Sequence, residues 1–278
     1  MTEATQGRRE LNRVARNHDL LLAATEIIAT EGVEGLTMTA VAESVGCAVG
    51  TIYTYFESKS ALLAALQLAA IQTLIDTFTT SAESWERAIS KADLDPVTAA
   101  LVRLVAIGQI LVAAGDIHER EFDLLQKLIS TPADLTTDSD RQEVIPLALE
   151  LLDTVRVFID HATSVGALSL PSSDSSVSRA IRWAGGINGA LLVSNVGIEA
   201  NRKNPPLFDG QALALSLAQD LLRSWGAPLP DLDAANLFVD HLIATDQLIA
   251  LRSQSVIDLT TSTVSQSPST ILTDYLID

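Results

Sequence analysis

Residues 37–62, which read TMTAVAESVGCAVGTIYTYFESKSAL, contain two short helical patterns separated by a glycine. Thr37 is a favourable N-cap for the first of these helices. Gly46 ends that helix, because glycine readily adopts the left-handed conformation found at helix C-termini. In the second helix, Ile52 and Phe56 are four residues apart and therefore lie on one inward face. Two short helices joined by a glycine turn form the helix-turn-helix pattern.

A third helix is expected to begin after Ser58, its N-cap, with Lys59 as its first residue. A cation at this position opposes the helix dipole, at a cost of about 0.3–1 kcal/mol. A phosphate held by Lys59 and the free backbone N–H groups would make the position favourable. The hydroxyls of Tyr53 and Tyr55 could also reach phosphate oxygens. The alternative is that both tyrosines pack against the first helix and Lys59 is solvated; the full ordered set favours contact with DNA.

Apolar residues recur at helical spacing along most of the chain, and no segment shows the sustained alternation of a strand. The sequence therefore predicts an all-α fold. A first helix is expected over residues 11–30, with Gly32 at its C-terminal end. Further long helices are predicted between Pro, Gly, Asn and Ser breakers, over residues 58–82, 95–114, 118–130, 141–168, 174–200, 209–225 and 231–254.

The chain of 278 residues carries a net charge of −17. Taken alone, this acidity argues against nucleic-acid binding, because such proteins normally present a basic surface. The charge is unevenly divided, however: residues 1–66 hold five basic and eight acidic residues, a net −3, and the remainder of the chain holds −14. We interpret the acidity as a property of the C-terminal part that limits non-specific affinity for DNA.

The bulk composition favours a soluble protein of the cytoplasm with no membrane association. Apolar residues make up 47% of the chain, enough for a large core, and Cys47 is the single cysteine. One cysteine cannot form an intrachain disulfide, which fits a reducing compartment. The stretch 97–115 is the most membrane-like, but Arg103 and Gln109 interrupt it, and a buried core helix is the preferred interpretation.

The N-terminal sixty or so residues resemble the DNA-binding domain of the TetR family of transcriptional regulators. The resemblance covers all the helices of this region. It rests on Leu20-Leu21-x-Ala23-Ala24, Gly32, Thr37, and Gly46-x-x-x-Gly50-Thr51-Ile52-Tyr53-x-Tyr55-Phe56-x-x-Lys59-x-x-Leu62. It implies an N-terminal arm and three-helix helix-turn-helix domain over residues 1–57, followed by a larger helical ligand-binding and dimerisation domain over 58–254. In this division residues 58–82 form a connecting helix. Residues 255–278 are rich in Ser and Thr, and this composition predicts a mobile or loosely docked tail.

The resemblance further implies a homodimeric repressor that binds a palindromic operator in double-stranded DNA and releases it when a small molecule binds. Ala48 and Val49 depart from the family pattern of a Ser or Thr cap followed by a polar residue, and Thr39 stands where Arg is frequent. These departures predict weak phosphate contact and readout through thymine methyl groups and Thr hydroxyls. Carried over by position, the DNA-facing residues are Thr37, Thr39, Val49, Gly50, Thr51, Tyr53, Thr54, Tyr55 and Lys59.

Four arginines before or early in the first helix could supply positive charge that this surface lacks. They are Arg8, Arg9, Arg13 and Arg16. One interpretation is an arm that binds the minor groove or phosphates. The other is a solvated, disordered tail.

The later helices offer apolar side chains for a ligand pocket, although each of them could equally be a core residue. A mainly apolar effector with a small polar head is expected, such as a fatty-acyl chain, a lactone or an aromatic drug. The candidate pocket residues are Phe78, Leu104, Ile107, Leu111, Phe122, Phe158 and His161.

Two C-terminal helices resemble those that pair across the two-fold axis of TetR-family dimers. Gly185 and Gly189, at a four-residue spacing, would allow close approach of a second helix. Packing within one subunit is the alternative. The candidate interface residues are Trp183, Gly185, Gly189, Leu217 and Leu221.

The sequence does not predict an enzyme. It contains no nucleophile elbow, no His-Glu-x-x-His motif and no glycine loop for phosphates, so no catalytic residues, cofactor or metal site are expected. A second hypothesis is an all-helical ligand-binding or adaptor protein whose helix-turn-helix has lost DNA binding, as Ala48, Val49 and the acidity suggest.

Overall fold

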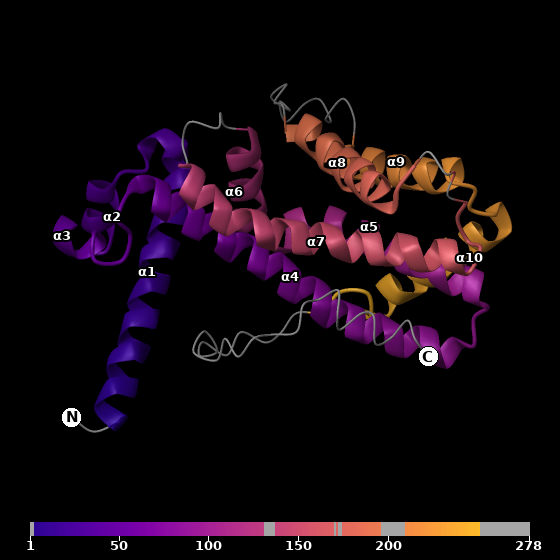
Figure 1. Ribbon diagram of the computed structural model, residues 1–278, viewed down its shortest axis with the longest axis horizontal. Helices are drawn as coiled ribbons and strands as arrows, with labels where there is room; N and C mark the ends of the chain where they lie inside the picture. Colours follow the sequence, from indigo (N-terminus) through magenta and orange to yellow (C-terminus); the bar gives the residue numbers. More distant parts are fainter. Residues whose placement is uncertain (1–2, 131–136, 170, 172–173, 196–208, 251–278) are drawn as a thin grey trace. The chain divides into compact units, whose positions relative to one another are not determined.

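The computed structural model describes residues 3–130, 137–169, 171, 174–195 and 209–250 (Figure 1). Every regular element in these ranges is a helix, which confirms the predicted all-α fold. The predicted tail, residues 255–278, lies outside the described residues. The helices are α1 (Glu3–Gly35), α2 (Met38–Ser44), α3 (Val49–Ile52), α4 (Lys59–Ala92), α5 (Pro96–Ile117), α6 (Glu119–Ser130), α7 (Asp138–Ser164), α8 (Ser176–Asn195), α9 (Gly210–Ser224) and α10 (Leu229–Ala244).

Three predicted helix ends require correction. Helix α1 begins at Glu3 instead of residue 11, because the polar residues before Leu11 include no proline to interrupt a helix. Helix α4 continues past residue 82 to Ala92, since Trp85 and Ile89 extend its buried face. Helix α10 ends at Ala244 and not at residue 254, because Asp246 adopts a left-handed φ of 54°.

Contacts between residues divide the chain into two compact units. Among the described residues, unit 1 comprises those of Met1–Thr73 and His118–Ala148, and unit 2 those of Leu74–Ile117 and Leu149–Arg252. The division does not follow chain order, because α4 and α7 each contribute residues to both units. The domain boundaries expected from the sequence stay a prediction.

Unit 1 has one hydrophobic core formed by the first four helices and α6. Figure 1 shows α2 and α3 beside the second half of α1. Gly32, with a φ of 77°, breaks the helical backbone near the end of α1, as the sequence predicts for this position. The fully or nearly fully buried core residues include Leu20, Ala24, Ile28, Val41, Ile52, Phe56, Leu62, Leu63, Leu66 and Leu124.

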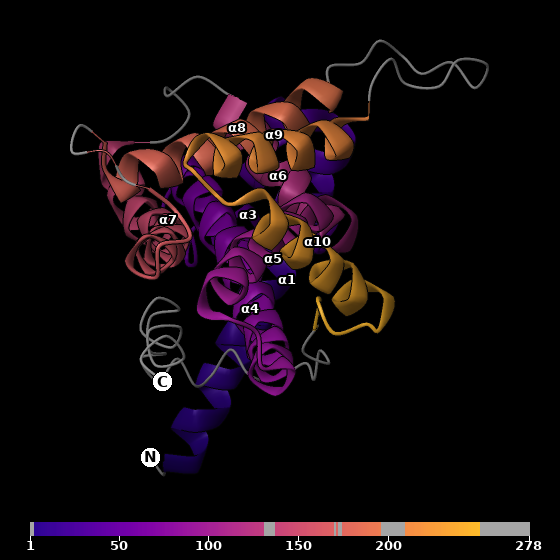
Figure 2. The same ribbon diagram turned by 90° about the vertical axis from the view of Figure 1, so that its right-hand side faces the viewer.

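Unit 2 is built around α5, which packs against α8, α9 and α10 (Figure 2). Helices α8 and α9 lie side by side. Helices α4 and α5 are both long and apolar enough to cross a membrane by length and composition, but 78% of the most apolar window of α5 is buried inside the protein. The expectation that residues 97–115 form a core helix is confirmed.

A buried ion pair joins α4 to α5 within unit 2. Arg103 donates from Nε and Nη2 to the two carboxylate oxygens of Glu86, at 2.7 Å each, and both side chains are almost completely buried. Arg103 is therefore not only an interruption of an apolar stretch. Its bidentate partner satisfies the charge that the apolar surroundings would otherwise destabilise.

Replacing Glu86 with Ala should lower the free energy of unfolding by about 3–5 kcal/mol, because Arg103 would remain buried without a partner. The double variant Glu86→Leu, Arg103→Met should recover most of this loss, since two apolar side chains carry no charge to desolvate. Urea unfolding followed by circular dichroism measures both values.

The control is Asp220→Ala, which removes the partner of Arg223 in an exposed pair. It should change the free energy of unfolding by less than about 1 kcal/mol. A loss in Glu86→Ala no larger than in this control would contradict the assignment.

Candidate functional site

The helix-turn-helix begins at Thr37, which caps α2 as the sequence predicts. Its backbone is extended, and its Oγ1 accepts a hydrogen bond of 3.0 Å from the backbone N–H of Ala40. Helix α2 ends in a left-handed turn at Gly46, whose φ is 66°. The N–H of Gly46 donates to Glu43 O and that of Cys47 to Ala42 O, which is the Schellman arrangement of hydrogen bonds.

Helix α3 contains four residues, continued by hydrogen-bonded turns to Phe56. Its N-cap, Ala48, provides no side-chain hydrogen bond. Ile52 and Phe56 are buried in the core of unit 1, as their spacing predicts. The apolar side of α3 is thus held in place, and the opposite side is free to contact a ligand.

The residues predicted to face DNA lie together on α2, α3 and the adjoining turns. Tyr53 has 53% of its surface exposed, whereas Tyr55 is half-buried and packs against the core cluster. The sequence did not separate these two tyrosines, of which Tyr53 is the more exposed. Thr37, Thr39, Gly50 and Thr54 are also exposed, and Val49, Thr51 and Lys59 are partly exposed.

The start of α4 is more fully bonded within the chain than the sequence indicated. Ser58 caps the helix, because its Oγ accepts a hydrogen bond of 3.0 Å from the N–H of Ala61. The ammonium group of Lys59 donates to the carbonyl oxygen of Val33, near the end of α1, at 2.9 Å. Lys59 is thus neither simply solvated nor free, although an ammonium has two further hydrogens to donate.

A carboxylate that no sequence pattern indicated also lies at this helix start. Asp140, in the first turn of α7, accepts a hydrogen bond from the hydroxyl of Ser60 and one of 2.5 Å from the hydroxyl of Thr137. The hydrogen bond from Ser60, followed by that from Thr137, lowers the pKa of Asp140. The carboxylate therefore stays ionised, and its charge disfavours a phosphate at this helix start.

Six of the seven predicted pocket residues belong to unit 2. The rings of Phe78 and Phe158 make an edge-to-face contact with centroids 6.3 Å apart, and Trp85 adds a second contact with Phe78 at 5.6 Å. Leu104 and Ile107 of α5 are buried. Leu111 of α5 is half-buried, and His161 lies on α7. Phe122, in contrast, belongs to α6 of unit 1 and is not part of this group.

Polar groups occur beside these apolar residues. Burial, and then the positive charge of Arg103, lowers the pKa of His161, so the imidazole is neutral at pH 7. The indole N–H of Trp85 and the hydroxyl of Thr80 are buried and have no hydrogen-bond partner among the described residues. Sequence reasoning missed Trp85 and Glu86; the single arginine in an apolar stretch was the signal for a buried partner.

The predicted dimer residues divide into internal and open positions. Trp183 is buried, and its ring would lie 3.2 Å from a Cβ at Gly108 of α5. The prediction for Trp183 is therefore corrected: its ring is an internal contact and is not available to a second copy. Leu217 and Leu221 are half-buried, and both lie within 4 Å of a Cβ placed at Gly186, so this glycine permits the close approach of α8 and α9.

One face of α8 is left uncovered by the residues that the structure describes. A Cβ placed at Gly185 or Gly189 would meet no atom within 4 Å. Val177, Ile181 and Val193 continue the same four-residue spacing and are each about half exposed, Ile181 at 54%. These five residues form an apolar ridge, here called the α8 ridge.

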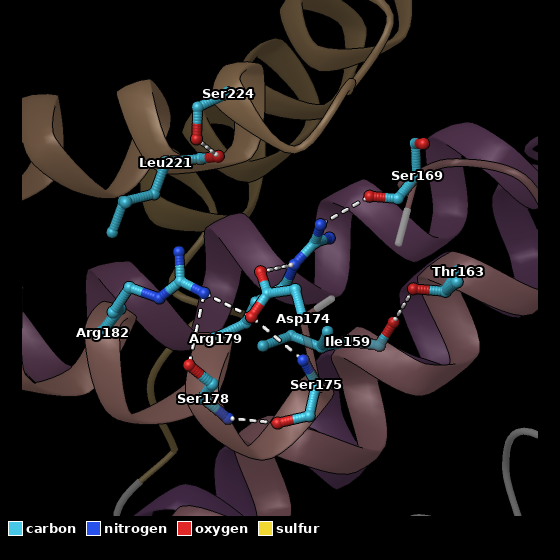
Figure 3. Close-up of polar contacts among 10 residues, drawn as sticks. All are labelled: Ile159, Thr163, Ser169, Asp174, Ser175, Ser178, Arg179, Arg182, Leu221 and Ser224. Carbon is cyan, nitrogen blue, oxygen red and sulfur yellow. Dashed lines mark hydrogen bonds and ion pairs between the residues drawn. The ribbon is translucent and has the colours of Figure 1, made fainter. Parts of the chain in front are cut away.

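The first turn of α8 is anchored by the buried Arg179 (Figure 3). Its guanidinium donates to the carboxylate of Asp174 at 3.1 Å and to the carbonyl of Ser169 at 2.6 Å, and it lies 5.1 Å from the ring centroid of Trp225 at the end of α9. Arg182 binds the other oxygen of Asp174. These contacts lower the pKa of Asp174, that with Arg179 first. They fix the direction of the α8 ridge relative to α9.

A model of the family described as bacterial regulatory proteins, tetR family, matches residues 20–66, which contain the complete helix-turn-helix. No curated protein matches the sequence.

Solved structures of regulators share the fold. One is a tetR-family regulatory protein from Rhodococcus RHA1, with a TM-score of 0.53, 14% identity, and coverage of 76% of this chain and 97% of that chain. Another is FadR from Bacillus subtilis, solved in complex with stearoyl-CoA, with a TM-score of 0.52, 18% identity, and coverage of 74% of this chain and 97% of that chain. A third is the fatty acid degradation regulator FadR from Bacillus halodurans, with a TM-score of 0.51, 17% identity, and coverage of 76% of this chain and 97% of that chain. At these identities the likeness shows the fold: an N-terminal helix-turn-helix domain and a C-terminal helical domain.

Proposed function

We propose that this chain, whose residues 20–66 match the tetR family of bacterial regulatory proteins, is a cytoplasmic, homodimeric repressor that binds a palindromic operator and releases it when an apolar effector binds. The observation that carries the proposal is the match over residues 20–66, together with the exposed outer surface of α3, whose inner residues Ile52 and Phe56 are buried in the core. No catalytic role is proposed.

Helix α3 is proposed to enter the major groove of the operator. Tyr53 is exposed and carries a hydroxyl suited to a phosphate oxygen, and Gly50 permits close approach of the backbone. The hydroxyl of Thr54, which is also exposed, donates to the carbonyl oxygen of Thr51 at 2.7 Å, so its proposed contact with DNA is through its methyl group. Val49 and Thr51 offer methyl groups for contact with thymine. The remaining proposed contacts are Thr37, Thr39, Tyr55 and Lys59.

The α8 ridge is proposed to pair with its copy across a two-fold axis. One short helix in one groove rarely gives useful affinity, so two chains on two half-sites are needed. Gly185 and Gly189 would let the two α8 helices approach closely, and Leu217 and Leu221 would complete the interface from α9. A Cβ at these glycines would meet no atom of the described residues within 4 Å, which supports pairing of the ridge with a second copy.

The effector is proposed to bind among Phe78, Leu104, Ile107, Leu111 and Phe158, with His161 near its polar head. The unpartnered indole N–H of Trp85 suits an effector with a carbonyl acceptor. FadR from Bacillus subtilis, which shares the fold, was solved with stearoyl-CoA, and a fatty-acyl effector is the first candidate here. Phe122, which belongs to unit 1, stays a prediction for this site.

Release is proposed as a population shift, in which the effector stabilises a dimer whose two α3 helices no longer match successive grooves. Helix α4 is the proposed carrier of the change. It provides Lys59 at one end and Phe78 and Trp85 further along, so a shift of this helix reaches both sites.

The second candidate is a ligand-binding or adaptor protein without DNA binding. Two observations favour it: Ala48 leaves α3 without a side-chain cap, and the start of α4 is bonded within the chain. An assay for DNA binding separates the two candidates.

The Tyr53→Ala variant should bind a duplex from the chain's own promoter about 10- to 100-fold more weakly, because a hydrogen bond to a charged phosphate contributes about 1.5–3 kcal/mol. Mobility-shift titrations at 50 and 200 mM salt measure this change. The control is Leu237→Ala, which alters a residue of α10 with 71% of its surface exposed and should bind as the parent does. Absence of binding by the parent chain at low salt would support the adaptor.

The Ile181→Glu variant should raise the dissociation constant of the dimer 100-fold or more. Each of the two copies loses the burial of an isoleucine, which contributes about 1.5–3 kcal/mol, and gains a charge. Light scattering coupled to gel filtration measures the mass over a concentration series. The control Leu237→Glu introduces the same charge on α10 and should remain dimeric. Equal behaviour of the two variants would contradict an interface at the α8 ridge.

Fatty acids and acyl-CoA thioesters of increasing length should release the promoter duplex progressively better. Each buried methylene adds about 0.8 kcal/mol, or close to fourfold in affinity, until the pocket is full. Calorimetry and the release of a fluorescent duplex measure how affinity depends on chain length. Phe78→Ala should weaken this dependence, whereas Leu237→Ala should leave it unchanged. Binding of highly charged metabolites alone, without dependence on chain length, would overturn the proposed effector class.

A further inference from the structure

The basic side chains of unit 1 differ in how they are engaged. Lys59 bonds to a backbone carbonyl, and Arg120 of α6 lies 3.4 Å from a carboxylate of α1. Arg9, Arg13 and Arg16, in the first half of α1, make no ion pair within the described part of the chain. Among the basic side chains of unit 1 that the structure describes, those available to an external anion therefore gather on α1.

These three arginines lie on one face of α1. Their spacing of four and three residues places them one above another, and Leu20 and Ala24 continue the same stripe into the core of unit 1. Arg9 and Arg13 are exposed and Arg16 is partly exposed. Figure 1 shows this half of α1 running beyond α2 and α3. The helix thus turns the same face inward along its second half and presents it as a basic stripe along its first.

We propose that Arg9, Arg13 and Arg16 form a rigid helical arm that binds the backbone phosphates of double-stranded DNA next to the site contacted by α3. The proposal rests on the DNA-binding function proposed above. Positive charge repeated along one face complements the regular line of phosphates on a DNA strand, which are about 3.4 Å apart along the axis. The face spans about 10 Å from Arg9 to Arg16, enough to contact more than one phosphate.

The helical conformation decides between the alternatives that the sequence left open. A helix with its side chains is about 10–12 Å wide, and the minor groove is about 6 Å wide, so the arm cannot enter the minor groove. The arginines are also not part of an irregular tail, because residues 8–16 are helical. Contact of the exposed guanidinium groups with phosphates fits this helical conformation, and it would provide positive charge where the start of α4 is already bonded internally.

The test compares the salt dependence of DNA binding in the full-length chain. For B-DNA, log K falls against log salt concentration by about 0.9 for each phosphate neutralised. The triple variant Arg9→Ala, Arg13→Ala, Arg16→Ala should lower this slope by about 2.7 for each bound chain. Between 50 and 200 mM salt, its affinity should then fall about 40-fold less per chain than that of the parent. The effect should be equal on the promoter duplex and on a random duplex, because phosphates carry no sequence information.

Two control variants separate the arm from general charge. Arg8 is exposed and about 100° around the helix from Arg9, so Arg8→Ala removes the same charge off the stripe and should leave the slope unchanged, whereas Arg13→Ala should lower it by about 0.9. Replacing all three arginines with Lys should retain the slope. Alanine favours helices, and circular dichroism should show an unchanged fold.

The outcomes are distinct. If the parent chain binds no duplex at low salt, the proposed function fails. The proposed arm is contradicted, and the proposed DNA-binding function is not, in either of two cases. In the first, the parent binds and the triple variant keeps its salt slope; in the second, Arg8→Ala lowers the slope as much as Arg13→Ala. An unchanged slope on DNA with arginine-dependent binding to vesicles of anionic phospholipid would assign the stripe to a membrane and overturn the proposal.

Discussion

Helix α3 depends on the packing beneath it. The first turn of a helix fixes several dihedral angles for one hydrogen bond, so isolated helices shorter than about 12 residues are marginal in water. Ile52 and Phe56 bury the inner side of α3 in the same core as Leu20 and Ala24 of α1. Because this attachment is apolar, the outer side keeps its polar and small residues for contact with a partner. The geometry of the whole proposed reading surface follows from it.

The parts of this domain that could be predicted from sequence are those determined locally. Thr37 and Ser58 cap helices through residues three positions away, and Gly46 ends a helix through its own backbone, so short patterns were sufficient. The bonds of Lys59 and Ser60 were not predictable in this way. Their partners lie 26 and 80 residues away in the chain, and no local pattern specifies which carbonyl or carboxylate will be the neighbour.

The same distinction explains the outcomes in unit 2. Helical periodicity placed Trp183 on an apolar face, but it could not show that α5 covers this face through Gly108. The glycine that permits close packing of α8 and α9 is Gly186, which spacing alone did not indicate, and the role of Gly185 and Gly189 against a second copy stays a prediction. Arg103 similarly needed the fold to identify Glu86 as its partner.

The separation of roles within α3 has an evolutionary consequence. Gly50, Thr51 and Thr54 contribute to the outer side of the helix, whereas Ile52 and Phe56 hold it in the core and Val49 packs partly against that core. Most substitutions on a surface away from the core change stability little. A new preference for a DNA sequence can therefore arise at the outer positions without a matching change in the core, and gene duplicates of this chain could diverge in target while keeping the same foldability.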